Sequence, residues 1–307
     1  MLSRRSILFA WPAAFCCRGL LIPARAATGA GKRVAVFFPP ALDPCAEAVE
    51  GFRLRLAGSE ITVTLIDVNN AALAAEEFTR KPVAVVAVGS EAVQAVLAQT
   101  PLPVTISTMT LEADHPAALR SARAHAAVYL DIPVRTQVAE LRKLFPEKAR
   151  VGVIRNPNRG SSTVSQIRGQ SPETASLQIA DCATPDELLA AFLSLRKRVD
   201  FVICLPDSSL YNGATARPLI MASLENRLPL VGFSPAFVRA GAAVGFWPDY
   251  RAIGQQTADL VRRCLDATDC SVSECPKKIN VAVNAKILRM LGIEFAAASN
   301  PDLVVLR

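Results

Sequence analysis

The feature that most constrains this chain is a strand–helix–strand pattern in residues 199–250. Residues 199–205 (VDFVICL) are mostly apolar and rich in β-forming side chains, which predicts a buried strand. Residues 206–209 (PDSS) supply turn residues, and residues 214–227 place apolar side chains at helical spacing. Residues 230–233 (LVGF) then predict a second buried strand. Because a strand–helix–strand unit is the building block of a parallel sheet, this segment indicates an α/β fold.

The same alternation extends along the rest of the chain. Further strands are predicted at residues 33–38, 61–68, 82–88, 103–107, 126–130, 150–155, 175–180, 241–247 and 278–283. Helical spacing separates most of them, and the alternation restarts at residue 150 after a less regular segment. With 307 residues, the chain is also too long for one small domain. The sequence therefore predicts two Rossmann-like α/β lobes with parallel sheets, joined by crossover strands.

The lobe boundaries are expected where the chain crosses between the two halves. Lobe 1 is predicted to span residues 32–128 and to be completed by residues from about 248 to 276. Lobe 2 is predicted to span residues 129–247 and to be completed by residues from about 277 to 295. We also expect a helix at residues 161–169 and an irregular tail from residue 296 onward.

The first 26 residues have the layout of an export signal. Arg4 and Arg5 precede an apolar run at residues 7–17, and residues 24–26 (ARA) offer small residues at a cleavage spacing. The paired arginines also resemble a twin-arginine signal. Without the four arginines of residues 1–26 the formal net charge falls from +7 to +3, with the remaining charges of both signs interleaved. The signal layout therefore favours an exported, periplasmic protein. The small, interleaved charge of the remaining chain argues against a nucleic-acid partner.

Export to an oxidising compartment changes how the cysteines are interpreted. Cys16 and Cys17 would leave with the signal, and six cysteines would remain. Cys204 lies in an apolar strand, where a buried free thiol is expected. Cys264, Cys270 and Cys275 lie close together in the sequence, and we predict a disulfide between Cys275 and either Cys270 or Cys264. No histidine lies nearby and no CxxC spacing is present, so no metal site is expected there.

Two segments carry a resemblance to a known family. They are residues 205–207 (LPD) with the helix that follows, and residues 229–242 (PLVGFSPAFVRAGA). Between residues 32 and 295 the chain resembles the substrate-binding proteins of ABC transporters, which have the periplasmic-binding-protein type I fold. Within them it resembles tryptophan- and tyrosine-type binders. Relatives that bind amino acids often have Asp-Asn after the strand that ends here at Leu205, so Asp207 matches the pattern and Ser208 departs from it.

The resemblance implies two lobes that close on a small-molecule ligand and deliver it to an ABC permease in the inner membrane, without chemistry. We expect a monomer with no cofactor. Polar groups after the carboxyl ends of parallel strands line the ligand crevice in such folds. The candidate ligand-binding residues on this rule are Ser90, Ser107, Thr108, Asn156, Asp207, Ser208, Tyr211 and Ser234.

Each candidate also has a purely structural interpretation. Ser90 and Ser234 can serve simply as helix N-caps. Capping is compatible with ligand contact, because the helix N-terminal amides after these serines can bind the carboxylate of the ligand. Asp207 can accept an ammonium group or serve as a turn residue. Tyr211 can stack on a flat ligand or pack at a lobe edge.

Catalysis has little support in the sequence, and we predict that the chain is not an enzyme. His115 and His125 are the only histidines, and both fall in the irregular segment between the halves. The phosphate-binding and nucleophile motifs G-x-G-x-x-G, G-x-x-x-x-G-K-[ST] and G-x-S-x-G are absent. Two alternatives to a transport role stay open at this point: a periplasmic ligand-sensing subunit of a signalling system, and a flavodoxin-like enzyme.

Overall fold

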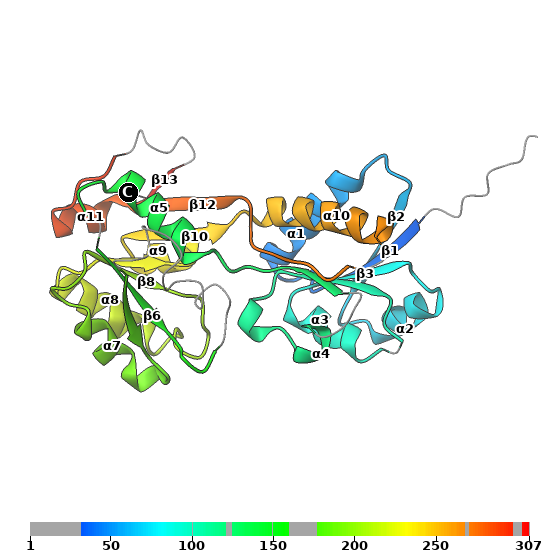
Figure 1. The fold of residues 1–307 in the computed structure, drawn as a ribbon, viewed down its shortest axis with the longest axis horizontal. Helices are drawn as coiled ribbons and strands as arrows, with labels where there is room; N and C mark the ends of the chain where they lie inside the picture. Colours follow the sequence, from blue (N-terminus) through cyan, green and yellow to red (C-terminus); the bar gives the residue numbers. More distant parts are fainter. Residues whose placement is uncertain are drawn as a thin grey trace, which may run out of the picture. The chain divides into compact units, whose positions relative to one another are not determined.

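The computed structural model describes residues 32–99, 101–120, 125–148, 150–159, 177–267, 270–296 and 303–306. Within these ranges strands and helices alternate and form one six-stranded and one seven-stranded sheet (Figure 1). The predicted α/β class with two mainly parallel sheets is confirmed. None of the helices in the described ranges combines the length and apolar character needed to cross a bilayer.

The first sheet has the strand order β11-β5-β4-β3-β1-β2, and all its neighbouring strands are parallel. Its strands are β1 (Lys32–Phe38), β2 (Ile61–Asp67), β3 (Ala84–Val88), β4 (Val104–Thr108), β5 (His125–Val128) and β11 (Ser273–Glu274). Val34 and Val36 of β1 belong to one buried cluster, and Ala35 and Phe37 belong to another. Both faces of the sheet are therefore buried, which explains why β1 and β3 are continuous apolar runs in the sequence.

Helices cover the two faces of the first sheet. The helices are α1 (Asp43–Leu56), α2 (Ala71–Thr79), α3 (Ser90–Leu97), α4 (Ala117–Arg120) and α10 (Tyr250–Asp266), with a 3-10 turn η1 (Glu112–Asp114). Side chains of α1 and α10 share the cluster of Val34 and Val36, whereas side chains of α2, α3 and α4 share the cluster of Phe37. The sheet is thus packed between helices from distant parts of the sequence.

The second sheet has the order β13-β12-β10-β9-β8-β6-β7. Its strands are β6 (Val151–Arg155), β7 (Gln178–Asp181), β8 (Phe201–Cys204), β9 (Leu230–Gly232), β10 (Val244–Pro248), β12 (Ile279–Asn284) and β13 (Val304–Leu306). β10 and β12 are antiparallel, and the other neighbours are parallel. The prediction of an irregular tail is wrong for residues 304–306, which pair with β12. Three residues are too few to show a periodicity, so only the partner strand reveals this element.

The second sheet is also buried on both faces. Its helices are α5 (Val134–Leu144), α7 (Leu188–Ser194), α8 (Ala216–Glu225), α9 (Pro235–Ala240) and α11 (Ala285–Leu291), with a 3-10 turn η2 (Pro185–Glu187). Val153 and Ile203 pack in a cluster with side chains of α5 and α11. Ile154 and Cys204, one residue further along each strand, pack with side chains of α7 and α8. The helix predicted at residues 161–169 lies outside the described residues.

Within the described ranges, the chain passes between the two sheets three times. Residues 129–133 lead from β5 to α5, and Asp249 leads from β10 into α10, which packs against α1 (Figure 1). Residues 275–278 then lead from β11 of the first sheet to β12 of the second. The lobe boundaries predicted above stay a prediction, but these three segments are the connections that any relative motion of the sheets would involve.

The structure corrects the predicted disulfide. Cys264, in the last turn of α10, is bonded to Cys270, with a Cα–Cα distance of 5.1 Å, and Cys275 is a free, half-buried thiol. The segment of Cys275 is held elsewhere: Gln256 Nε2 donates to the Cys275 carbonyl at 3.0 Å, and Tyr129 N donates to the Glu274 carbonyl at 2.9 Å. Strand pairing, which the cysteine spacing does not reveal, therefore decides which cysteines meet.

Reduction of the Cys264–Cys270 bond is expected to lower the free energy of unfolding by about 2 kcal/mol, because the bond closes a short loop in the unfolded chain. Urea unfolding with and without a reductant measures this difference. Cys275→Ala should retain the sensitivity to reductant, and Cys264→Ala should abolish it. If Cys275→Ala instead abolished the sensitivity to reductant and Cys264→Ala retained it, the Cys264–Cys270 pairing would be contradicted.

Candidate functional site

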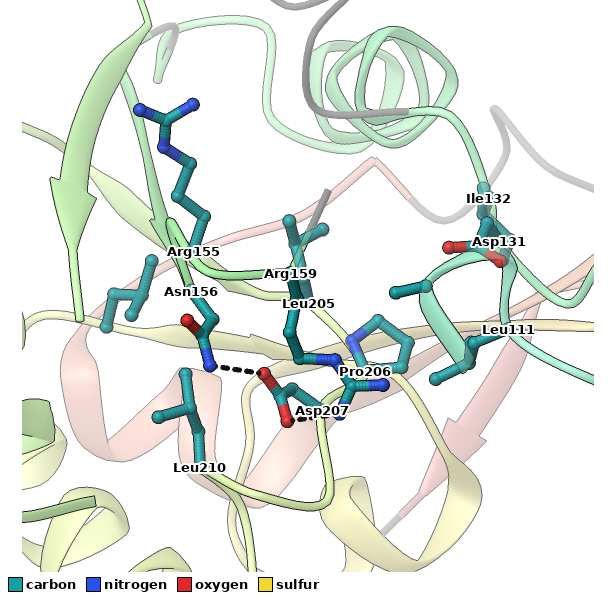
Figure 2. A pocket seen from close by; sticks show the side chains of 12 residues that line it. Leu111, Asp131, Ile132, Arg155, Asn156, Arg159, Leu205, Pro206, Asp207 and Leu210 are labelled. Carbon is teal, nitrogen blue, oxygen red and sulfur yellow. Dashed lines mark hydrogen bonds and ion pairs between the residues drawn. The ribbon is translucent and has the colours of Figure 1, made fainter. Parts of the chain in front are cut away.

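A pocket lies where β6 and β8 of the second sheet end. The chain after β6 contributes Asn156 and Arg159, and the chain after β8 contributes Asp207 (Figure 2). The opposite side comes from the first crossover and from the segment that contains η1. The pocket encloses about 540 Å³ of empty space, part of it open to solvent. The lining residues are Leu111, Ala113, Asp131, Ile132, Ile154, Arg155, Asn156, Arg159, Leu205, Pro206, Asp207 and Leu210.

Asp207 organises the loop after β8. It is only 6% exposed, and its Oδ1 accepts from the Ser209 backbone N at 2.8 Å and from Ser209 Oγ at 2.5 Å. The same oxygen accepts from Arg159 Nη1 at 3.0 Å, and Oδ2 accepts from Asn156 Nδ2 at 3.3 Å (Figure 2). The Asp207 carbonyl accepts from the Leu210 and Tyr211 backbone N–H groups. The carboxylate therefore joins the ends of β6 and β8 and already has donors on both oxygens.

Arg159 bridges two carboxylates within the pocket. Its guanidinium donates to Asp207 and also to Asp114 of η1. The second arginine of the lining, Arg155, donates through Nε to Asp181 Oδ1 at 2.6 Å. Both cationic side chains of the lining are therefore neutralised by acidic partners.

Asp131 lies on the other side of the pocket, beside Leu111 (Figure 2). Its Oδ2 accepts from the Glu112 backbone N at 2.7 Å. Burial raises the pKa of Asp131 to about 6, although this backbone N–H favours the charged form. Asp131 is therefore a carboxyl group that faces the pocket without the full stabilisation that a cation would provide.

The structure brings Asn156 and Asp207 together in this pocket. Ser208 lies next to Asp207 but is exposed, and Ser90 is exposed at the first position of α3. Ser234 caps α9, where its Oγ accepts from the Phe237 backbone N at 3.2 Å. Among the residues that line the described pocket, Ser90, Ser208 and Ser234 do not occur.

Ser107, Thr108 and Tyr211 are buried in packed regions. Ser107 Oγ lies 2.7 Å from His115 Nε2 and 3.0 Å from His125 Nε2. Thr108 Oγ1 donates to the Val128 carbonyl at 3.2 Å. The Tyr211 ring packs 5.5 Å from Phe233 and 6.0 Å from Phe237, centroid to centroid. These contacts account for the three side chains by packing, and their role in ligand binding stays a prediction.

Asp131 and Arg159 are two residues of the pocket that the sequence patterns did not single out. Asp131 follows the apolar run at residues 126–130, and Arg159 follows Asn156 in the turn after β6. The rule that polar groups after parallel strands face the ligand applies to both residues. Their proximity to Asp207 was not visible, because it depends on the meeting of three separate strand ends.

The two mainly parallel sheets, each covered by helices on both faces, have the periplasmic-binding-protein type I fold. Residues 58–298 match the model of the family described as ABC transporter substrate binding protein. The chain belongs to this family.

Solved structures with the same fold align over 90% of the chain. A ligand-free, open substrate-binding protein with adhesive properties from Clostridium difficile is 16% identical, with a TM-score of 0.66 and 99% of its chain covered. A conserved domain protein from Vibrio cholerae is 20% identical, with a TM-score of 0.57 and its whole chain covered. A protein domain from Streptococcus pneumoniae in complex with L-Trp is 14% identical, with a TM-score of 0.57 and its whole chain covered. No curated protein sequence matches the chain.

Proposed function

We propose that this chain is the exported solute-binding protein of an ABC importer, and that it captures a small solute of the amino-acid type for delivery to an inner-membrane permease. The observation that carries the proposal is the pocket at the strand ends. It combines apolar walls, such as Leu111 and Leu205, with charged groups of both signs, Asp131, Arg159 and Asp207. A small zwitterion with an apolar side chain has matching chemistry.

Capture in this proposal depends on relative motion of the two sheets. The solute enters at the ends of β6 and β8, and the segment with η1 and Asp131 closes against it. The three connecting segments allow this motion without unfolding either sheet. The permease then recognises the ligand-bound form.

Location and partners follow from the same proposal. Residues 1–26 act as the export signal and direct the protein to the periplasm, where it works as a monomer without a cofactor and without catalysis. Family membership and the L-Trp complex of the Streptococcus pneumoniae neighbour support an amino-acid ligand for this chain.

Thermal unfolding of the purified protein against a panel of amino acids and small metabolites tests this function. A bound solute at a hundred times its dissociation constant should add about 2.7 kcal/mol to the stability. Asp207→Ala should abolish the stabilisation, because the substitution releases Arg159 and Asn156 from their positions in the pocket. The matched control is Asp266→Ala, because the Asp266 side chain is 74% exposed and, among the described residues, pairs only with Lys32.

Three comparisons in the same unfolding experiment show whether the proposed function is correct. The Asp266→Ala variant should respond to the panel like the unmodified protein. A panel without any stabilising compound would contradict the capture of a small metabolite. An equal response in the Asp207→Ala variant would contradict this pocket as the binding site.

A further inference from the structure

We infer that Asp131 is the counter-ion for an ammonium group of the captured solute, so that this pocket selects organic cations and zwitterions over anions and neutral molecules. The inference rests on the proposed capture function and specifies the ligand chemistry. It assigns the ammonium group to the crossover between the sheets and not to Asp207, the residue that the sequence pattern favours.

The charges around the pocket leave Asp131 unbalanced. Arg155 is paired with Asp181, and Arg159 is paired with both Asp207 and Asp114. Asp131 has no cationic partner among the described residues; its carboxylate accepts from uncharged backbone N–H groups. The two arginines of the lining are therefore already paired with carboxylates, and Asp131 adds a negative charge that no cation among the described residues balances.

The two carboxylates differ in how many donors they already accept from. Asp207 accepts from four described donors, namely Ser209 N, Ser209 Oγ and Arg159 Nη1 on Oδ1 and Asn156 Nδ2 on Oδ2, and it is only 6% exposed. Asp131 receives its bond from Glu112 on Oδ2, and among the described residues no side chain donates to its Oδ1. An incoming ammonium group therefore finds a less occupied acceptor at Asp131 than at Asp207.

Asp131 also lies in a mainly apolar part of the pocket lining. The pocket places Leu111, Ala113 and Ile132 around it, so a carboxylate here gives up part of its hydration without a compensating charge. Burial accordingly raises the pKa of Asp131 to about 6. An ammonium group attached to an apolar body would supply the missing charge and cover the apolar wall at the same time.

Matched probe pairs test the inference on the purified protein. The pairs differ only in the ammonium group: L-phenylalanine and hydrocinnamate, L-leucine and isocaproate, phenethylamine and phenethyl alcohol, isoamylamine and isoamyl alcohol. Calorimetric titration should show that the ammonium member of a pair binds at least tenfold more tightly. Asp131→Asn should weaken that member about tenfold to a hundredfold, since it removes a charge-assisted hydrogen bond.

Two variants distinguish the loss of the Asp131 contact with the probe from the loss of one negative charge or of the fold. Asparagine keeps a carbonyl oxygen that can accept from the Glu112 backbone N–H, so Asp131→Asn preserves the anchor of this segment. Asp266→Asn removes the same single negative charge from an exposed surface site and should leave all affinities unchanged. Melting curves of both variants without probes report whether the fold is retained.

The pH dependence of binding provides a readout that a purely structural role would not produce. The affinity of the unmodified protein for phenethylamine should decrease as the pH falls through about 6, because protonation removes the charge of Asp131. In Asp131→Asn this decrease should disappear. Glu112 and Cys275 are the other titratable groups that influence this carboxyl, and Arg135 lies beside Cys275.

The outcomes distinguish this inference from the capture function. If only hydrocinnamate, isocaproate or the alcohols bind, capture of a small solute holds and the ammonium assignment is overturned. If the ammonium probes bind equally well to the unmodified protein and Asp131→Asn, the assignment to Asp131 is overturned. If no probe or panel compound binds, both the capture function and the inference are contradicted.

Discussion

Replacing Gly254 with alanine is expected to lower the free energy of unfolding by about 3 kcal/mol or more, because no space exists for a Cβ atom. Gly254 lies in α10 where this helix crosses α1. An added Cβ would lie 1.8 Å from the Ala48 carbonyl oxygen and 2.8 Å from the Phe52 backbone N. Both atoms belong to the α1 backbone, so no side-chain rotation can relieve the overlap.

The contact between α1 and α10 is reciprocal. A Cβ at Gly51 of α1 would lie 2.1 Å from the Arg251 carbonyl oxygen of α10. Relief at either glycine would require the two helices to separate, and with them the cluster that contains Phe52, Ile253 and Leu260. Gly51→Ala should therefore be similarly destabilising, and the double variant should cost less than the sum, because one separation accommodates both methyl groups.

Urea unfolding followed by circular dichroism measures these effects. Gly213→Ala is the matched control, because nothing lies within 4 Å of an added Cβ at this position. The control should change the unfolding midpoint little. A Gly254→Ala variant as stable as the Gly213→Ala variant would show that the α1–α10 packing is looser than the structure indicates.

Acidification from pH 6.5 to pH 4 is expected to remove about 3 kcal/mol of stability through His125. Burial, together with a smaller effect of the neighbouring His115, lowers the pKa of His125 from its ordinary value of 6.5 to about 4. The native state therefore keeps the ring neutral over a range in which the unfolded chain binds a proton. Stability is fully present above pH 6.5 and is lost as the pH falls toward the lowered pKa.

The geometry around Ser107 explains why the neutral form is required. The Ser107 hydroxyl lies within hydrogen-bonding distance of Nε2 of both His115 and His125, and the two rings are 4.7 Å apart. The hydroxyl has one proton, so it can donate to one ring while it accepts an N–H from the other. Protonation of both rings would leave two donors and two positive charges in a buried space around one hydroxyl.

The difference between the unmodified protein and His125→Gln isolates this contribution. Glutamine can place a polar group near Ser107 but does not titrate, so the variant should lose the acid sensitivity assigned to His125. Asp131, whose pKa is raised to about 6, has the opposite effect on stability between about pH 4 and pH 6 and is common to both proteins. Equal pH profiles of the two proteins would contradict the assignment to His125.

The sequence by itself determined the α/β class and most of the strands, because buried parallel strands must be apolar on both faces and the helices between them must be amphipathic. It also placed Asn156 and Asp207 among the polar residues that follow the strand ends, and the structure shows that these two are hydrogen-bonded to each other. The short strand β13 was not visible, because its partner strand β12 is distant in the sequence. The Cys264–Cys270 pairing was not visible either, because the strand pairing of neighbouring segments decides which cysteines meet.

Only the tertiary structure decided what each polar side chain contacts. Ser107 and Thr108 satisfy the same strand-end rule as Asn156, yet they are buried at the end of β4, where they contact His115, His125 and Thr257. Asp131 and Arg159 meet the pocket because three chain segments converge there. A linear pattern reports the periodicity of burial along one element, whereas the partner of a charge is set by the atoms that other elements bring within a few ångströms.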